Sequence, residues 1–515
     1  MNTTNGAVAG RAARSTPHLR EFLADTLTPV SVFSRLRALS DFRFLFESIS
    51  GGEQVSRFSF AGAAPAEVLL LFEDRVLVAD PERLDEARPL DGAPLKALQR
   101  RMESIRAEGD HGELPFIGGW VGYFGWDLIR LLERLPNRPP DDYGLPIAMF
   151  ARYDAVVIID HARQRIVLVS NEIEANDAAG TEGVTASQAE QRLDRLTRVL
   201  STSSEAAAQS LPAGDLPPAR LSPPTLSDEE YRDVVRRAKE YIAAGDIFQM
   251  VPARRWQIEE DLDPLALYRS LRLVNPSPYM FLLESPEVTL VGGSPEVLVR
   301  AQDDAFSVRP IAGTRPRGET AAEDKDLERE MLDDPKEVAE HVMLVDLGRN
   351  DLGRVGRAGT VRVSDFMVVE KYSHVMHIVS NVEAKRAEGR SALDALFACF
   401  PAGTLSGAPK IRALEIMDEM EPVARGPYGG AVGYLSFNGD MDTCITIRTL
   451  VVQPGSITVS AGAGLVADSD PEAEQQETRA KAAALLRAVA LAKELDSADR
   501  AAPKRSDKEP AEGAS

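Results

Sequence analysis

Short apolar runs separated by turns dominate the first third of the chain. Residues 42–46 and 68–72 are two examples, each made mostly of large hydrophobic side chains. Runs of this length, bounded by polar turn residues, are typical of β-strands and too short for helices. The pattern over residues 18–170 therefore predicts a strand-rich region.

The clearest helical segment follows at residues 228–244. Ser227 precedes it, acidic residues fill its first turn, and Gly245 follows it. Serine is a favoured N-terminal cap, and glycine readily adopts the left-handed conformation that ends helices. This segment is expected to be a capped helix and to open the second half of the chain.

Tight turns and irregular helix spacing decide the fold class. The segment Asn438–Asp440 contains Asn-Gly between apolar runs, which is a hairpin signal. Helices are interspersed without regular β-α-β alternation, so we expect an α+β protein: two packed, largely antiparallel β-sheets with helices outside. Residues 118–123 resemble residues 429–434. The two halves are therefore expected to hold similar sheets packed on each other, with chance similarity as the alternative.

Shifts in composition suggest the domain boundaries. A stretch poor in large apolar residues reads as a linker, apart from a possible helix at 187–200, and both ends of the chain read as disordered tails. The expected divisions are a tail at 1–17, an N-terminal half at 18–225 that includes the linker at about 172–227, a denser half at 228–490 with most of the candidate chemistry, and a tail at 491–515.

The formal net charge of −21 over 515 residues argues against nucleic acid or an anionic membrane as partner. An anionic substrate would need a local cation to approach such a protein. The two cysteines exclude a disulfide framework, and Cys399 lies in an apolar run that predicts a buried, inert thiol. No apolar run reaches the length of a membrane span, and the first residues lack an apolar signal core. We expect a cytoplasmic protein.

Two Glu-x-x-Glu pairs are the strongest chemical signal. Glu337 and Glu340 follow one Pro-initiated helix start, and Glu474 and Glu477 follow another. Carboxylates three residues apart share one helix face, and four of them facing each other would form a hard oxygen site suited to Mg²⁺. A solvated acidic helix face is the ordinary alternative.

Other segments carry weaker signals. His377, in a strand-like run, is either a satisfied core residue or a proton shuttle beside the carboxylates. Arg448 interrupts an otherwise apolar strand-like segment and would need a carboxylate partner if buried. Residues 462–464 form a backbone nest for an anion or a tight turn. Residues 401–410 lack the Gly-Lys-Ser/Thr ending of a nucleotide-binding loop.

Taken together and in order, these segments resemble the chorismate-utilising enzymes, most closely the large subunits of anthranilate synthases, over about residues 20–490. The resemblance rests on residues 245–249, 293–296, 310–318, 337–351, 401–410 and 462–481.

Two positions distinguish the subtypes of this family. Relatives that attack chorismate with water resemble one another in having Lys where this chain has Gln249, and relatives that make aminodeoxychorismate typically have a nucleophilic Lys in place of Ala312. Gln cannot act as a base and Ala cannot act as a nucleophile. Both positions therefore favour direct amination and anthranilate as product, over aminodeoxychorismate synthase as the alternative.

The resemblance also implies roles for the carboxylates. Mg²⁺ would be held by Glu340 and Glu477, with Glu337 and Glu474 acting through water or supporting the ligands, and it would clamp the ring carboxylate. Glu296 would be the general acid for the C4 hydroxyl that leaves as ammonia adds at C2.

The remaining implied site residues act on the second step and on substrate binding. His377 would transfer the proton in pyruvate elimination. Arg448 and Tyr428 would hold the enolpyruvyl carboxylate, and Lys481 would balance charge. Further hydrogen bonds would come from Gly313, Thr314, Thr404, Gly462, Ala463 and Gly464.

Partners and regulation follow from the same resemblance. Neither cysteine lies in a Gly-x-Cys-x-Gly elbow, so ammonia would come from a separate glutamine amidotransferase subunit in a heterotetramer. Residues 45–48 and 275–280 resemble the family's tryptophan-feedback motifs, which makes the first committed step of tryptophan biosynthesis the implied reaction. The expected effector residues are Ser48, Pro278, Tyr279 and Met280. A catalytically silent tryptophan-binding protein is the alternative from another class.

Overall fold

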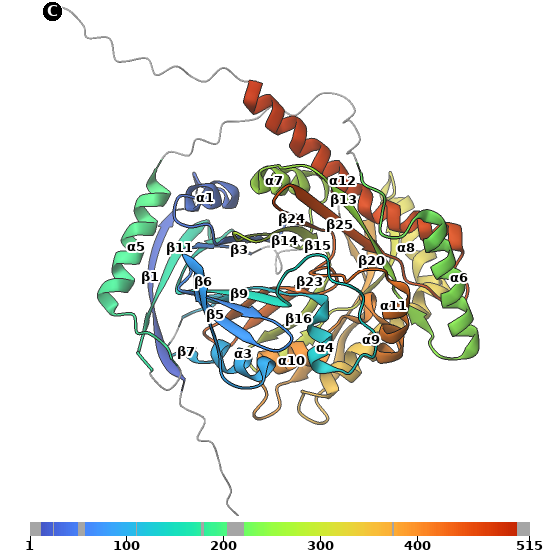
Figure 1. Cartoon of the computed structure of the whole chain (residues 1–515), viewed down its shortest axis with the longest axis horizontal. Helices are drawn as coiled ribbons and strands as arrows, with labels where there is room; N and C mark the ends of the chain where they lie inside the picture. The colour runs from blue at the N-terminus through green and yellow to red at the C-terminus, as the bar shows by residue number, and fades with distance from the viewer. Residues whose placement is uncertain are drawn as a thin grey trace, which may run out of the picture.

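Two large β-sheets packed face to face form the centre of the molecule (Figure 1). The computed structural model describes residues 12–23, 25–49, 57–109, 111–176, 180–202, 221–372 and 375–501. Pairing within both sheets is antiparallel except between β1 and β7. This arrangement confirms the expected α+β class.

The first sheet has 11 strands in the described part of the chain. They are β1 (Ala13–Leu23), β2 (Arg43–Glu47), β3 (Phe58–Ala63), β7 (Ile105–Ala107), β10 (Ala155–Asp160), β11 (Arg165–Ile173), β13 (Ala253–Ile258), β14 (Tyr279–Glu284), β15 (Thr289–Ser294), β24 (Thr449–Gln453) and β25 (Ser456–Gly462).

The second sheet has 12 strands in the same described ranges. They are β4 (Glu67–Leu71), β5 (Val76–Asp80), β6 (Arg83–Pro89), β8 (Gly119–Phe124), β9 (Ala148–Tyr153), β16 (Val297–Gln302), β17 (Ala305–Val308), β18 (Ile311–Pro316), β19 (Arg362–Lys371), β20 (Val375–Lys385), β22 (Ala431–Ser436) and β23 (Met441–Ile445). A separate short pair joins β12 (Gln249–Met250) to β21 (Gly407–Ala408).

Helices cover the outer faces of both sheets (Figure 1). Those on the first sheet are α1 (Pro29–Leu36), α5 (Ala186–Ser201), α7 (Pro264–Val274) and α12 (Pro471–Ala501). Those on the second sheet or beside it are α3 (Pro94–Met102), α4 (Ile129–Leu132), α6 (Asp228–Ala244), α8 (Ala321–Asp333), α9 (Pro335–Gly353), α10 (Ala392–Cys399) and α11 (Lys410–Met420).

Local sequence signals explain several element ends. The Ser227 hydroxyl caps α6 by accepting a hydrogen bond from the Glu230 N–H, and Gly245 ends the helix with φ of 84°. The expected hairpin at 438–440 joins β22 to β23, and α5 begins one residue before the predicted helix. In each case the interacting residues lie within a few positions of one another in the sequence, which is why the sequence alone indicates them.

The expectation that each half of the chain forms its own sheet is wrong. The two similar Gly-rich segments are neighbouring strands of one sheet, β8 and β22, with Gly122 opposite Gly433. A Cβ at Gly122 would lie 1.9 Å from the Met149 carbonyl oxygen, and one at Gly433 would lie 2.0 Å from that of Asp442. The glycines recur because the backbone of each strand approaches its neighbour closely. Each sheet joins a block of strands from one half to a block from the other, through the pair β14–β2 in the first sheet and β22–β8 in the second.

The expected tails are also too long. β1 begins at Ala13 and pairs with β11 and β7, so residues 13–17 belong to the first sheet. α12 continues to Ala501, because Leu485, Val489 and other apolar side chains of this helix pack into the core over the first sheet. Residues 1–11 and 502–515, and residues 203–220 of the expected linker, lie outside the described residues.

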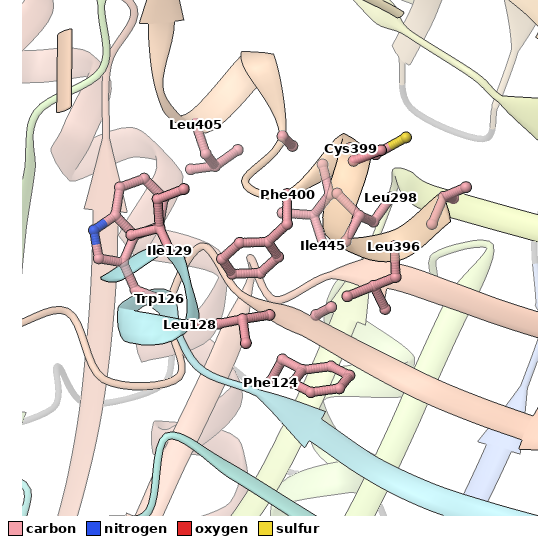
Figure 2. Close-up of a cluster of buried hydrophobic side chains, with 14 of the residues drawn as sticks. Phe124, Trp126, Leu128, Ile129, Leu298, Leu396, Cys399, Phe400, Leu405 and Ile445 are labelled. Atoms are coloured by element: carbon pink, nitrogen blue, oxygen red, sulfur yellow. The ribbon is translucent and has the colours of Figure 1, made fainter. Parts of the chain in front are cut away.

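Three apolar layers stabilise this arrangement: one between the sheets and one beneath the helices on each outer face. Figure 2 shows part of the layer between the second sheet and α10, where Phe400, Leu405 and Ile445 pack with Leu298. Two of these residues flank the loop at 401–404, and Leu298 follows Glu296 by two positions. Core packing therefore fixes the backbone that carries two of the predicted catalytic groups.

Candidate active site

The N-terminal turns of α9 and α12 bring the two Glu-x-x-Glu pairs close to each other. Asp334 caps α9 by accepting from the Lys336 N–H, and Asp470 accepts from the Ala473 N–H at the start of α12. Burial raises the pKa of the Glu340 carboxyl, and its neighbour Glu337 and the facing Glu477 raise it further. Electrostatic coupling between residues of the two helices therefore supports the predicted convergence.

Each of the other three carboxylates also has a protein partner. Glu337 accepts from Arg315 at 3.1 Å, Glu474 accepts from the Ser469 hydroxyl at 2.7 Å, and Glu477 pairs with Lys481 at 2.6 Å. Among the described residues, no group of three His, Cys, Asp or Glu side chains is close enough to hold a metal ion as it stands.

The donor chemistry nevertheless fits a divalent cation. Glu340 is half-buried beside two other carboxylates, and its only side-chain hydrogen bond within the described ranges is a long one, 3.4 Å, from the Gln249 amide. A hard cation relieves the mutual repulsion of neighbouring, partly buried carboxylates. Glu340 and Glu477 therefore fit the magnesium ligands expected from the sequence, and the supporting roles of Glu337 and Glu474 stay predictions.

Glu296 and Thr404 form a buried pair. The Thr404 hydroxyl lies 3.1 Å from each carboxyl oxygen of Glu296, and burial raises the pKa of this carboxyl to about 8. Glu296 is therefore protonated near neutral pH, which is the state that a general acid requires. Gly403 lets the loop that carries Thr404 pack closely against α9, because a Cβ at this position would lie 2.1 Å from Leu347 Cδ2.

His377 is held in one tautomer by β18. Its Nδ1 lies 3.0 Å from the Gly313 carbonyl oxygen and 3.1 Å from the Thr314 hydroxyl. A carbonyl can only accept, so we assign the ring proton to Nδ1 and the free lone pair to Nε2. Burial lowers the pKa of His377, with a further contribution from Arg448. The imidazole is therefore neutral and able to act as a base.

The surrounding sequence suggested that Arg448 lies within a strand, and this is wrong. It lies between β23 and β24 with φ of 51°, where its carbonyl accepts from the Gly293 N–H. Burial lowers the pKa of the guanidinium, and its closest hydrogen bond is to the Lys481 carbonyl at 3.4 Å. Within the described ranges no ion pair joins Arg448 to a carboxylate, so a carboxylate ligand would satisfy it.

Tyr428 and the turn at 462–464 lie beside this arginine. Burial raises the pKa of Tyr428 to about 12, and the Gly462 N–H donates to its oxygen. Lys481 donates to the Gly462 carbonyl at 3.0 Å. The Ala463 N–H donates to the Tyr231 hydroxyl at 3.2 Å, so this amide is not available as the substrate donor that the sequence suggested. Gly464 instead lies next to the Gln249 side chain: a Cβ built at this glycine would be 3.2 Å from the Gln249 amide nitrogen.

The expected effector residues also come together. Ser48, Pro278, Tyr279 and Met280 line one hollow of about 510 Å³, partly open to solvent, between β2, β14, β22 and β23. The Ser48 hydroxyl is buried in the described structure without a hydrogen-bond partner. An unsatisfied hydroxyl beside apolar walls is the expected feature of a small-molecule site.

Sequence reasoning missed much of the lining of this hollow. Phenylalanines 46, 58, 60 and 281 supply aromatic walls. Arg300 contributes a polar edge by donating to the Tyr279 hydroxyl at 2.9 Å and pairing with Asp442 at 2.8 Å. The aromatic residues alternate along β2 and β3, which is a detectable signal, but the pairing of Arg300 with Asp442 depends on the contact between β16 and β23.

Comparisons with known proteins agree with this geometry. Residues 42–487 match the model of the family described as chorismate binding enzyme, so the chain belongs to that family. It is similar to anthranilate synthase component 1 of Acetivibrio thermocellus, with 45% identity over 93% of this chain and 96% of the relative. The Pseudomonas aeruginosa protein of the same name is 46% identical over 92% of this chain and 95% of its own length.

Solved structures give the same placement. Component I of the anthranilate synthase of Streptococcus pneumoniae superposes with a TM-score of 0.74 at 33% identity, covering 90% of this chain and 99% of that one. The menaquinone-specific isochorismate synthase of Escherichia coli shares the fold, with a TM-score of 0.66 at 18% identity over 93% of this chain and 97% of that one. None of the helices in the described ranges has the length and apolarity needed to cross a membrane.

Proposed function

We propose that the protein is the large subunit of an anthranilate synthase. It converts chorismate and ammonia to anthranilate, pyruvate and water, in a reaction that requires Mg²⁺. Relatives named anthranilate synthase component 1 support this proposal through identities near 45% over most of both chains. The single structural observation that carries it is that the chain holds both a buried, protonated Glu296 and a neutral His377, which are an acid and a base suited to the two chemical steps.

The first step adds ammonia at ring C2. The nitrogen lone pair forms the C2–N bond, the two ring double bonds shift, and the C4–O bond breaks. Glu296 donates its proton to the departing oxygen, and Thr404 fixes the orientation of the carboxyl group. A proton donor whose pKa lies near the working pH gives efficient general acid catalysis.

The second step removes pyruvate and forms the aromatic ring. His377 takes the proton from C2 through Nε2, while the Gly313 carbonyl keeps its Nδ1 protonated and the ring oriented. Arg448 binds the enolpyruvyl carboxylate, and Tyr428 lies beside it as a second contact. Because the Arg448 side chain is half-buried and burial lowers the pKa of its guanidinium, this ion pair would be partly shielded from bulk water, which strengthens it.

Two residues select ammonia and the anthranilate route. Gln249 hydrogen bonds to Glu340 and has no basic group to activate water. Ala312 pairs with Ile378 in the β18–β20 ladder and offers no nucleophile. Both features support anthranilate as the product over aminodeoxychorismate.

Mg²⁺ would be held by Glu340 and Glu477 and, when bound, would neutralise the ring carboxylate and draw electron density from the ring. Glu337 and Glu474 would keep these ligands oriented, and Lys481 would hold the Glu477 carboxylate in place through its ion pair. The name component 1 carried by the relatives supports a second component, which we propose to be a glutamine amidotransferase that supplies ammonia.

We further assign the hollow beside Ser48 to tryptophan as feedback inhibitor. Its phenylalanines suit an indole ring, and Ser48, with an unpaired hydroxyl, offers a hydrogen bond to the polar end of the ligand.

One assay tests the whole proposal. The purified chain is mixed with chorismate, ammonium and Mg²⁺, and anthranilate is followed by its fluorescence. Formation of anthranilate that requires Mg²⁺ and falls when tryptophan is added is the expected result. A non-fluorescent aminated product would make the protein an aminodeoxychorismate synthase, and absence of any turnover would leave a tryptophan-binding protein without activity.

A further inference from the structure

A hollow of about 400 Å³, partly open to solvent, lies behind Glu296. Of the predicted site residues, only Glu296 and Thr404 line it; the residues assigned to the carboxylates of chorismate do not. Its floor is the apolar cluster of Figure 2, to which Leu298 and Cys399 belong. The lining of the hollow therefore reaches past the general acid to residues that have no assigned role in holding the substrate.

One face of α9 connects this hollow to the metal-binding carboxylates. Glu340, Leu344, Leu347 and Asp351 are spaced by four, three and four residues, so they share that face. The last three line the hollow. Asp351 lies eleven residues, or roughly 16 Å along the helix axis, from Glu340. The lining thus begins at Leu344, one helical turn from Glu340, and continues along the helix to Asp351.

The reaction needs a route at this position. When the C4–O bond breaks, the Glu296 proton leaves with the departing oxygen as water, and the ammonium formed at C2 releases a proton to solvent. The net change is chorismate plus ammonia to aminated intermediate plus water, so Glu296 must recover one proton before the next turnover. The residue is buried, and Thr404 is its side-chain hydrogen-bond partner in the described structure.

Asp351 gives the far end of the hollow a polar group. Lys410 donates to its carboxylate at 3.1 Å and reaches the Cys399 carbonyl at 3.5 Å. Asn350 and Arg354 also act on this carboxylate. A cavity lined only by apolar groups stays dry, whereas one that offers water two or more polar partners holds ordered water.

One lining residue of the hollow, Arg309, is partly exposed to solvent. Its side chain is 35% exposed and forms an ion pair with Glu370 on β19. The lining therefore holds the charged side chains of Asp351 and Arg309 besides Glu296.

We infer that this hollow is a water-filled passage through which the water released from C4 leaves and a proton returns to Glu296, and that Asp351, held by Lys410, keeps it hydrated. The inference rests on the proposed amination of chorismate. Asp351 acts through water and makes no contact with the reacting atoms.

The test separates the first turnover from later ones. The full chain in excess over chorismate, with ammonium and Mg²⁺, gives the rate of a single turnover of enzyme that starts with Glu296 protonated. Excess chorismate gives the steady-state rate. The double variant Asp351→Leu with Lys410→Met makes the end of the passage apolar without leaving an unpaired buried charge. Asp351→Asn keeps a polar group at the same position.

We expect the double variant to keep its single-turnover rate within about threefold of wild type while kcat falls at least about tenfold. We expect a larger solvent deuterium isotope effect on kcat, and a KM for chorismate that falls together with kcat because kcat/KM reports only the steps of the first turnover. Asp351→Asn restores kcat to within about threefold. Val308→Phe, which fills the hollow from the opposite wall and leaves the ion pair intact, is expected to behave like the double variant and serves if the latter does not fold.

Single-turnover and steady-state rates that fall together would mean that Asp351 only supports the loop at 401–404, and they would overturn the inference. Unchanged kcat in folded variants would overturn it as well. Failure of the wild-type chain to make anthranilate would instead count against the proposed function.

Discussion

The backbone N–H of Ile445 donates to the Glu296 carbonyl oxygen at 3.0 Å. The preceding residue, Cys444, lines the hollow that holds the expected effector residues, and it pairs with Val297 in the β16–β23 ladder. Strand β23 therefore contacts both Glu296, the proposed general acid, and the hollow of the expected effector residues. A ligand that shifts β23 would change the position of Glu296 directly, which gives a physical route for inhibition.

Blocking the effector hollow should remove inhibition. Ser48→Phe replaces the buried hydroxyl with an aromatic ring that takes up space in the hollow. We expect the tryptophan concentration for half inhibition to rise at least about tenfold, with kcat within about twofold of wild type. Ser187→Phe, on the exposed side of α5, is the matched control. Unaltered sensitivity in the Ser48 variant would rule out this hollow as the tryptophan site.

Removing either proposed magnesium ligand should weaken metal binding. Glu340→Gln and Glu477→Gln replace an anionic oxygen donor with a neutral amide, and we expect kcat to fall about a hundredfold or more. Isothermal titration with Mg²⁺ checks the binding separately from the activity. Glu472→Gln, an exposed carboxylate of α12 paired with Arg232, is the control and should titrate like wild type. Unchanged Mg²⁺ binding in both ligand variants would refute the assignment.

The sequence could predict those features of the fold and site that depend on residues close together in the chain. The caps of α6, the hairpin after β22 and the Glu-x-x-Glu spacing all depend on residues within one or two turns of each other. The pairing of β8 with β22 joins residues about 300 positions apart, and period-two alternation does not specify which strand becomes the neighbour. The sequence therefore predicted strands correctly but assigned them to the wrong sheets.

The same limit applies within the site. The left-handed turn of Arg448 and the hydrogen bond from the Ala463 N–H to Tyr231 arise from packing between distant segments. Tyr231 is fully buried on α6, more than 200 residues before the turn whose amide it binds. A sequence pattern can place Ala463 in a Gly-rich turn, but only the fold shows that its amide is already paired.

Removal of the base should separate the two chemical steps. His377→Ala leaves Glu296 and the carboxylates in place but deletes the imidazole that we propose accepts the C2 proton through Nε2, and that the Gly313 carbonyl orients. We expect amination to continue and the aminated intermediate to accumulate, with anthranilate formation at least about a hundredfold slower. Chromatography of the products measures both species. His18→Ala is the control, because this half-buried histidine lies on β1, far from His377 in the sequence. Normal anthranilate formation by the His377 variant would exclude this role.

The raised pKa of Glu296 predicts how activity and stability change with pH. The folded-state pKa is about 8, against an ordinary value of 4.5. Activity that depends on the protonated acid should therefore fall as pH rises through about 8. Between these two values the folded state binds a proton that the unfolded state has released, so the free energy of unfolding should decrease as pH rises from 4.5 to about 8.

Glu296→Gln isolates this contribution, because the amide is neutral at every pH. We expect the variant to lose at least about a hundredfold in kcat and to accept no proton in this range. Its melting temperature, compared with wild type at pH 5 and at pH 8, should rise relative to wild type at the higher pH. A constant difference between the two proteins across this range would show that Glu296 does not change protonation on folding, and a general acid charged at neutral pH could not protonate the leaving hydroxyl.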